Sequence, residues 1–241
     1  MKFSKTKRTS ISVISGLLLI LMVWGCGSSE TKTDAKLETS SAATGQKTSL
    51  PPASTKHTVL FFGNSLAAGY GVEPSQAFPA LIGEKIDSAG LNYTVVNAGL
   101  SGETTAGGKS RIGWVLRQPV AVFVLELGGN DGLRGLPLSA TRQNLQAILD
   151  TVRRKSPQAT IVLAGMQIPP NLGTDYTREF RELFKELADK NKAILIPFLL
   201  ESVGGVPKLN QADGIHPNPA GHKIVAETVW GVIRPVLEKK V

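Results

Sequence analysis

Two kinds of apolar segment alternate from Thr58 to the C-terminus, and this alternation constrains the fold more than any other feature. Five short runs are apolar at consecutive positions, as strands covered on both faces are. They are Val59–Phe62, Tyr93–Val96, Val120–Leu127, Thr160–Leu163 and Ala193–Ile196. Between and after them, apolar residues recur at helical spacing, as at Leu145, Ile148, Leu149 and Val152. The pattern therefore predicts strands joined by helical crossovers, and hence a parallel sheet with helices on both faces.

The charge of the chain is concentrated at its N-terminus. The formal net charge is +8, and residues 1–56 hold eight basic and three acidic residues. Residues 57–241 carry only +3 and contain no basic stripe interleaved with aromatic residues, so the sequence does not favour nucleic-acid binding. The single cysteine excludes an intramolecular disulfide framework and a zinc site built on several cysteines.

The first 25 residues have the pattern of an export signal. Four basic residues stand within the first eight positions, and the apolar run Ile11–Trp24 follows them. A membrane-spanning helix needs about 20 apolar residues, so this shorter run favours a signal peptide over residues 1–25. Cys26 closes the run, and the junction resembles the lipobox of bacterial lipoproteins, in which the cysteine is lipidated and becomes the mature N-terminus. The alternatives are ordinary signal cleavage nearby and an uncleaved anchor.

The segment 26–56 is rich in Ser, Thr, Ala and Lys and nearly lacks large apolar side chains. Such a composition cannot bury enough surface to offset the entropy of ordering, so it predicts a flexible linker that starts at the lipidated cysteine. Residues 57–241 are then one folded domain, a normal size for a single hydrophobic core. This organisation predicts a domain tethered to a membrane of the bacterial cell envelope, facing the periplasm or the exterior.

Four segments rich in glycine and polar residues follow strand ends or precede the last helical pattern. They are Gly63-Asn64-Ser65-Leu66, Asn97-Ala98-Gly99-Leu100-Ser101-Gly102-Glu103, Gly128-Gly129-Asn130-Asp131-Gly132 and Asp213-Gly214-Ile215-His216-Pro217. Ligands bind beyond the carboxyl ends of the strands in sheets of this kind. Together the segments supply a hydroxyl, backbone N–H groups in tight turns, a side-chain amide and an Asp–His pair. Acyl transfer through a serine nucleophile needs these groups.

The four segments resemble the sequence blocks of the SGNH, or GDSL-type, hydrolases, which contribute Ser, Gly, Asn and His in this order. The chain is most similar to the bacterial periplasmic thioesterase/lysophospholipase/arylesterase subgroup, over VLFFGNSLAAGYGV, VVNAGLSGETTAGG, VLELGGNDGLRG and DGIHPNPAGH. The resemblance covers the chain from about residue 58 onward. It implies a three-layer α/β/α, flavodoxin-like fold with a central five-stranded parallel sheet.

The resemblance also implies the roles of the site residues. Ser65 is the expected nucleophile, His216 its base and Asp213 the residue that orients the imidazole. The N–H groups of Ser65 and Gly102 and the amide of Asn130 are the expected oxyanion hole. The spacing of three between Asp213 and His216 predicts that both side chains lie on one side of a helical turn.

One position departs from the family pattern, because Asn64 stands where the name-giving motif has Asp. The family's Asp is not the nucleophile, so the departure puts the hydrogen bonding around the Ser65 turn in question. His222 with Asp213 offers too few ligands for a metal site, and we expect neither a metal nor a cofactor.

The segment from Ile168 to Tyr176 is expected to line the acyl pocket, with Ile168, Pro169 and Tyr176 as lining residues. The leading hypothesis is a monomeric, lipid-anchored serine esterase that acts on small acyl esters, thioesters or lysophospholipids. The alternatives are a carbohydrate O-acetyl esterase and a non-catalytic lipoprotein that binds acyl chains or glycans. The intact serine, glycine, asparagine and histidine blocks weigh against the last of these.

Overall fold

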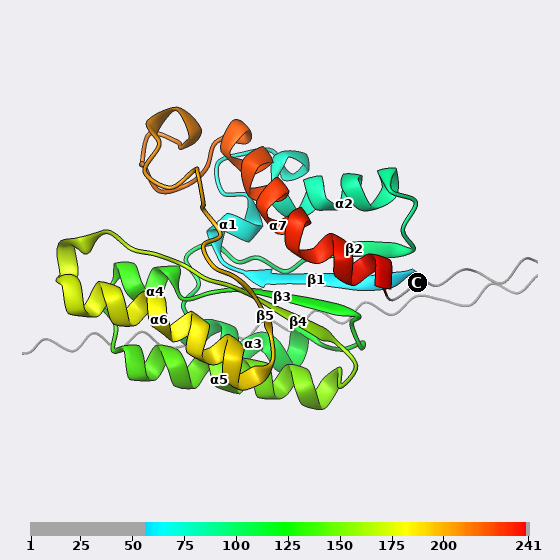
Figure 1. Ribbon diagram of the computed structural model, residues 1–241, viewed down its shortest axis with the longest axis horizontal. Helices are drawn as coiled ribbons and strands as arrows, with labels where there is room; N and C mark the ends of the chain where they lie inside the picture. The colour runs from blue at the N-terminus through cyan, green and yellow to red at the C-terminus, as the bar shows by residue number, and fades with distance from the viewer. Residues whose placement is uncertain (1–55, 240–241) are drawn as a thin grey trace, which may run out of the picture. The chain divides into compact units, whose positions relative to one another are not determined.

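A parallel sheet of five strands forms the centre of the computed structural model, which describes residues 56–239 (Figure 1). The strands are β1 (His57–Gly63), β2 (Tyr93–Asn97), β3 (Val122–Glu126), β4 (Thr160–Ala164) and β5 (Ile194–Ile196). Their order across the sheet is β2-β1-β3-β4-β5, and every neighbouring pair is parallel. The five apolar runs of the sequence therefore form five strands, as predicted.

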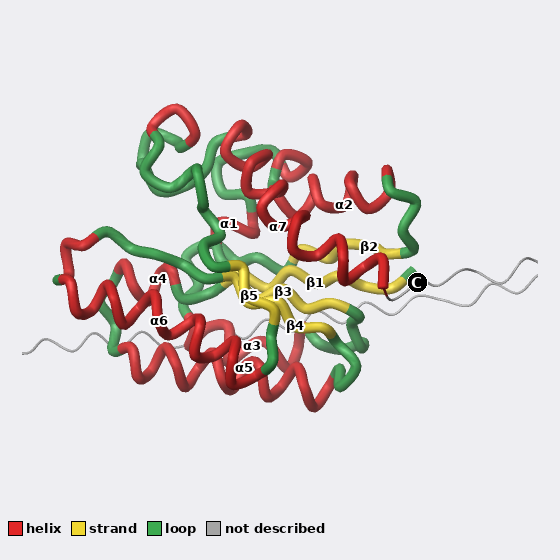
Figure 2. Tube along the Cα trace, viewed as in Figure 1, coloured by secondary structure: helices red, strands yellow, loops and turns green. Residues whose placement is uncertain are grey.

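Helices cover both faces of the sheet. They are α1 (Ser65–Ala68), α2 (Phe78–Ser88), α3 (Thr105–Val115), α4 (Gly129–Leu133), α5 (Leu138–Lys155), α6 (Thr174–Asn191) and α7 (Pro219–Lys239). Short 3-10 turns lie at Pro74–Gln76, Pro170–Leu172 and Pro207–Leu209. Helices α2 and α7 pack on one face, and α3, α5 and α6 pack on the other (Figures 1 and 2). The predicted three-layer α/β/α architecture is confirmed.

The strands differ in burial according to their place in the sheet. Strand β3 is buried at every position, and most of β1 and β4 is buried too. The edge strand β2 buries only its first residue, Tyr93, and β5 buries only Ile196. The expectation that all five runs are covered on both faces is thus wrong for the edge strands, whose other residues stay partly or fully exposed.

The register of the sheet brings the ends of β1 and β3 together. Gly63, the last residue of β1, lies beside Glu126, the last residue of β3. On the other side of β1, Phe61 pairs with Asn97 at the end of β2. The loops that leave these three strands therefore emerge next to one another, and three of the four glycine-rich segments lie in these loops.

The predicted signal peptide, Cys26 and nearly all of the linker lie outside the described residues. Within residues 56–239, none of the helices combines the length and the apolar character needed to cross a membrane.

Burial of His222 on α7 predicts a loss of stability in acid. Its Nδ1 accepts a hydrogen bond from the backbone N–H of Phe78 at 3.2 Å. Burial, and secondarily the charge of His216, lowers the pKa of His222 from 6.5 to about 4. Between these pH values the folded state binds fewer protons than the unfolded state, so stability falls as the pH falls through this range.

We expect His222→Asn to reduce this pH dependence, because the Asn oxygen can replace Nδ1 as acceptor and does not titrate. The measurement is urea unfolding of both proteins at pH 7 and pH 5. The quantity compared is the loss of unfolding free energy between pH 7 and pH 5 in each protein, and the difference between the two proteins cancels the contributions of other titrating groups. An equal loss of stability in the two proteins between these pH values would contradict the assignment.

Candidate active site

The turn between β1 and α1 presents Ser65 just beyond the end of β1, the strand next to the central strand β3. Asn64 is the N-cap of α1, and its side-chain oxygen accepts a hydrogen bond from the N–H of Leu66 at 3.0 Å. Gly63 has no room for a side chain, since a Cβ there would lie 2.4 Å from Oε2 of Glu126. The glycine therefore lets the strand pass close to this carboxyl group, and Ser65 follows at the first position of the helix.

The structure brings Ser65, His216 and Asp213 into one hydrogen-bonded chain. The Ser65 Oγ lies 2.9 Å from His216 Nε2, and His216 Nδ1 lies 2.7 Å from Asp213 Oδ2. Ser65 and His216 are 151 residues apart in the sequence. The ring of Tyr70 packs against the imidazole with a centroid distance of 4.8 Å and helps to fix its position. This is the arrangement of a hydroxyl, a base and an orienting carboxylate that activates a serine.

Asp213 and His216 lie in a turn just before α7 rather than in a helix. The Asp213 Oδ1 accepts hydrogen bonds from the backbone N–H groups of Ile215 and His216, at 2.9 and 3.0 Å, and Gly214 has a φ of +70°. The predicted helical turn is wrong here, because the aspartate side chain organises the backbone as an Asx-type turn. The spacing of three still places the carboxylate against the imidazole.

Hydrogen bonds keep the Asp213 carboxylate ionised. The N–H groups of His216 and Ile215 hold the pKa of Asp213 at about 2, well below its usual value of 3.8. At neutral pH the group is thus negative, so it can accept the Nδ1–H of His216 and orient Nε2 toward the Ser65 hydroxyl.

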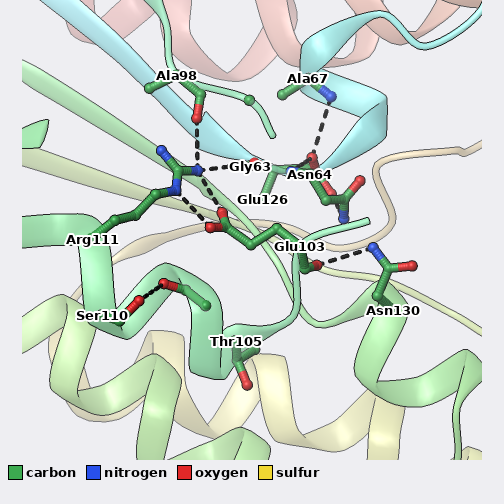
Figure 3. Close-up of polar contacts among 12 residues, drawn as sticks. Gly63, Asn64, Ala67, Ala98, Glu103, Thr105, Ser110, Arg111, Glu126 and Asn130 are labelled. Atoms are coloured by element: carbon green, nitrogen blue, oxygen red, sulfur yellow. Dashed lines mark hydrogen bonds and ion pairs between the residues drawn. The ribbon is translucent and has the colours of Figure 1, made fainter. Parts of the chain in front are cut away.

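Asn130 and Gly102, the expected oxyanion donors, come from two different loops. Asn130 lies on α4, directly after β3, and one N–H of its amide donates to the carbonyl of Glu103 at 3.0 Å (Figure 3). Gly102 has a φ of +78°, and its carbonyl accepts from Arg134 at 3.1 Å. The link through Glu103 ties the asparagine loop to the glycine loop.

An ion pair that the sequence analysis missed supports the glycine loop. Arg111 on α3 binds Glu103 through Nε and Nη2, at 2.6 and 2.5 Å, and donates to the carbonyl of Ala98 at 2.8 Å (Figure 3). The guanidinium also packs over the ring of Phe62 at 4.1 Å. A charged pair eight residues apart at a helix start was the only available signal, and it does not by itself indicate a tertiary role.

The cavity beside Ser65 has a volume of about 390 Å³. Its walls are mainly apolar and include both Ser65 and His216. Its lining residues are Asn64, Ser65, Leu66, Gly129, Asn130, Leu133, Met166, Gln167, Ile168, Pro169, Phe198, Leu200, Gly204, Gly205, Gly214, Ile215 and His216. Ile168 and Pro169 thus line it, as expected.

The structure does not bring Tyr176 or Gly102 to the wall of this cavity. The Tyr176 hydroxyl instead donates to the carbonyl of Leu136 at 2.8 Å, because the segment turns at Pro170–Leu172 before α6 begins. The sequence analysis missed Phe198 and Leu200, which line the cavity from the loop that follows β5.

A second hollow of about 560 Å³ lies between α2 and α7. It is lined partly by Lys85 and Glu227, which form an ion pair with a 2.6 Å separation. Ser65, Asp213, His216 and Asn130 are not among the residues that line it. In the described part of the chain, the His, Cys, Asp and Glu side chains do not form a cluster of three or more that could hold a metal ion.

The model of the GDSL-like lipase/acylhydrolase family matches residues 61–224. The chain belongs to this family. The match includes the nucleophile turn, the glycine loop, the asparagine loop and the Asp–His turn of this GDSL-like hydrolase.

Named relatives of this GDSL-like hydrolase are esterases. Esterase TesA of Pseudomonas aeruginosa is 41% identical over 181 residues, 75% of this chain and 89% of the relative. Thioesterase 1/protease 1/lysophospholipase L1 of Escherichia coli is 38% identical over 181 residues, 75% of this chain and 85% of the relative. An arylesterase of Vibrio mimicus is 36% identical over 172 residues, 71% of this chain and 85% of the relative. The chain is thus a carboxylic ester hydrolase.

Solved structures match the fold of this GDSL-like hydrolase. The crystal structure of TesA has a TM-score of 0.71 at 40% identity and covers 75% of this chain and 99% of its own. The SGNH-hydrolase family esterase AlinE4 has a TM-score of 0.62 at 41% identity and covers 77% and 97%. Both matches agree with a five-stranded parallel sheet enclosed by helices.

Proposed function

We propose that this GDSL-like hydrolase is a serine esterase that forms an acyl-enzyme on Ser65. The observation that carries the proposal is the hydrogen-bonded chain from the Ser65 Oγ through His216 to Asp213, with separations of 2.9 and 2.7 Å. Its position at the wall of an apolar cavity supports the same conclusion.

In the proposed mechanism, the Ser65 Oγ attacks the carbonyl carbon of the substrate while His216 Nε2 takes the hydroxyl proton. The electron pair of the C=O bond moves to oxygen, and the oxyanion is held by the N–H groups of Ser65 and Gly102 and the amide of Asn130. The intermediate then expels the alcohol or thiol, which takes the proton from His216. Asp213 stabilises the imidazolium formed between these steps.

Hydrolysis of the acyl-enzyme repeats the same sequence with water. His216 removes a proton from the water as it attacks the acyl carbon, and it returns this proton to Ser65 Oγ as the acyl–serine bond breaks. The reaction therefore needs only groups of the chain itself and leaves a free carboxylic acid.

Acyl esters and thioesters are the substrates we propose, including lysophospholipids. Leu133, Met166, Ile168 and Phe198 give the cavity an apolar lining that favours an alkyl or aryl acyl group over a sugar. The printed names of the relatives, which include a thioesterase, a lysophospholipase and an arylesterase, support the same class.

A panel of substrates tests this proposal. The panel holds p-nitrophenyl esters of increasing acyl length, acyl-CoA thioesters, a lysophospholipid and acetylated sugars. We expect turnover of the esters and thioesters, with kcat/KM depending on acyl length. Preference for acetylated sugars would identify an O-acetyl esterase instead. Binding of acyl chains without any turnover would identify a non-catalytic lipoprotein.

We also propose that Cys26 carries lipid and holds the domain on the extracytoplasmic face of a bacterial membrane. The support comes from the sequence, since the only cysteine closes a short apolar run after a basic start. A flexible linker of roughly 30 residues has a root-mean-square reach of about 30 Å, which would keep the domain near the bilayer.

Cys26→Ser is expected to abolish incorporation of a labelled fatty acid and to alter processing of the precursor. The measurement is metabolic labelling and fractionation of cells that produce each form of the full chain. Recovery of wild-type protein that is unlipidated and cleaved at another site would contradict the anchor. The esterase proposal would be unaffected, because no step of the reaction involves Cys26.

A further inference from the structure

A buried carboxyl group lies directly beneath the nucleophile turn, and the proposed mechanism does not use it. Glu126, the last residue of β3, is only 1% exposed. Its Oε2 accepts hydrogen bonds from the backbone N–H groups of Asn64 and Ala67, at 2.9 and 3.3 Å. Its Oε1 accepts from Nδ2 of Asn64 at 2.7 Å. Figure 3 shows this group between β3 and the start of α1.

These contacts fix the orientation of the Asn64 amide. Its nitrogen faces Glu126, so its oxygen faces the turn, where it accepts from the N–H of Leu66 at 3.0 Å and lies 3.3 Å from the Ser65 Oγ. The N–H groups held by Glu126 belong to residues on both sides of Ser65. The carboxyl group therefore holds the short backbone segment that carries both the nucleophile and an oxyanion N–H.

We propose that Glu126 is the positioning residue of the nucleophile turn, and that Asn64 and Glu126 act as a matched amide–carboxyl pair. The inference rests on the proposed function, because positioning matters only if Ser65 is the nucleophile. It also gives a partner to the amide at position 64, where the family motif has Asp: in this chain the amide donates to the carboxyl group at 126.

The donors and acceptors of the two side chains determine which residues fit together at positions 64 and 126. Both Glu126 oxygens face N–H donors, and each keeps an acceptor lone pair whether the group is ionised or protonated. A Gln at 126 has only one acceptor atom, so its NH₂ group would face either the backbone N–H groups or the Asn64 NH₂ group. Rotating the Asn64 amide would only move the conflict to the N–H of Leu66. A buried donor opposite another donor is costly, so the turn must shift.

Asn64→Asp creates the opposite mismatch. Two carboxyl oxygens would then face each other where the amide nitrogen and Oε1 are now 2.7 Å apart, and one of them must hold a proton. Burial favours the protonated form of the carboxyl group near neutral pH, since it raises the pKa of Glu126 from 4.5 to about 8. Exchanging both groups, with Asp at 64 and Gln at 126, restores one donor between the two side chains and needs no proton.

Other charged groups around the turn influence this pH dependence. The negative charge of Glu103 raises the pKa of Glu126 further, while the N–H groups of Asn64 and Ala67 lower it. Arg111 on α3 pairs with Glu103 and donates to the carbonyl of Gly63 at 3.4 Å. His216 lies on the other side of Ser65, with its Nε2 2.9 Å from the Ser65 Oγ, and Asp213 lies behind it.

The test measures kcat and KM from pH 6 to pH 9.5 for wild type, Glu126→Gln, Asn64→Asp and the double exchange. At pH 7 we expect Glu126→Gln to lower kcat about 10–100-fold with KM changed less than about threefold, because the displaced turn carries the nucleophile but forms only a small part of the cavity wall. The double exchange should recover most of kcat. Asn64→Asp should keep substantial activity at pH 6 and lose it as the pH rises, in a range where the wild type and the double exchange do not.

Ile233→Ala serves as the matched control for lost stability. Ile233 is fully buried on α7, near Leu237, whose carbonyl accepts from Tyr93 at the opposite end of the sheet from Ser65. We expect this variant to have a lower melting temperature and an unchanged kcat. It shows whether destabilisation alone can produce the loss of kcat in Glu126→Gln.

Three results would overturn the proposal: a kcat of Glu126→Gln within about threefold of wild type, a double exchange no more active than this single variant, or an Asn64→Asp pH profile that matches wild type. If Glu126→Gln does not fold, the Asn64→Asp profile and the double exchange still decide the matter. Lack of turnover by the wild-type protein would instead overturn the proposed function itself.

Discussion

Ser65→Ala is expected to abolish ester hydrolysis, with kcat falling on the order of 10⁴-fold or more. The variant removes the Ser65 Oγ, which lies 2.9 Å from His216 Nε2, so the base loses the nucleophile that it is proposed to activate. Ser65 is 8% exposed, and its side chain contributes little to the core, so the fold should persist. The expected effect is therefore on catalysis and not on structure.

The measurement combines p-nitrophenyl ester hydrolysis with labelling by a fluorophosphonate probe, which reacts with activated serines. The wild type should be labelled and Ser65→Ala should not, although both should show the same cooperative thermal unfolding. Persistent labelling of a folded Ser65→Ala protein would mean that another residue is the nucleophile.

Asn130→Ala is expected to lower kcat about 10²–10³-fold with little change in KM, the usual size of losing one oxyanion donor. The amide is at the cavity wall beside Ser65, where negative charge develops on the substrate oxygen. Its contact with the substrate strengthens as that charge forms, so its loss raises the barrier more than it weakens binding.

The same amide also holds the glycine loop through the carbonyl of Glu103 at 3.0 Å, so the loss must be separated from a loop displacement. Arg111→Lys is the matched comparison, because it weakens the support of the same loop through Glu103 and leaves Asn130 in place. A smaller kcat loss in Arg111→Lys than in Asn130→Ala would assign the larger part of the Asn130→Ala loss to weaker stabilisation of the oxyanion. A change confined to KM in Asn130→Ala would make Asn130 a substrate-binding residue instead.

The fold followed from local patterns in the sequence. Continuous apolar runs such as Val122–Leu125 are typical of strands in the middle of a covered sheet, and the helical stripes between the runs indicate parallel crossovers. Ser65, Asn130 and His216 were also accessible from the sequence, since each stands in a short segment whose residue types and order are typical of one chemistry.

The tertiary structure alone decided how these segments support one another. Glu126 lies inside the apolar run Val120–Leu127 in the sequence, and only the pairing of Gly63 with Glu126 across β1 and β3 reveals that it lies under the nucleophile turn. Likewise Tyr176 lies in the segment that was predicted to line the cavity, but its hydroxyl donates to the carbonyl of Leu136. Local composition specifies which elements form, because that depends on neighbouring residues. The partners of a buried polar group depend on strand order and register, which bring together residues 62 positions apart.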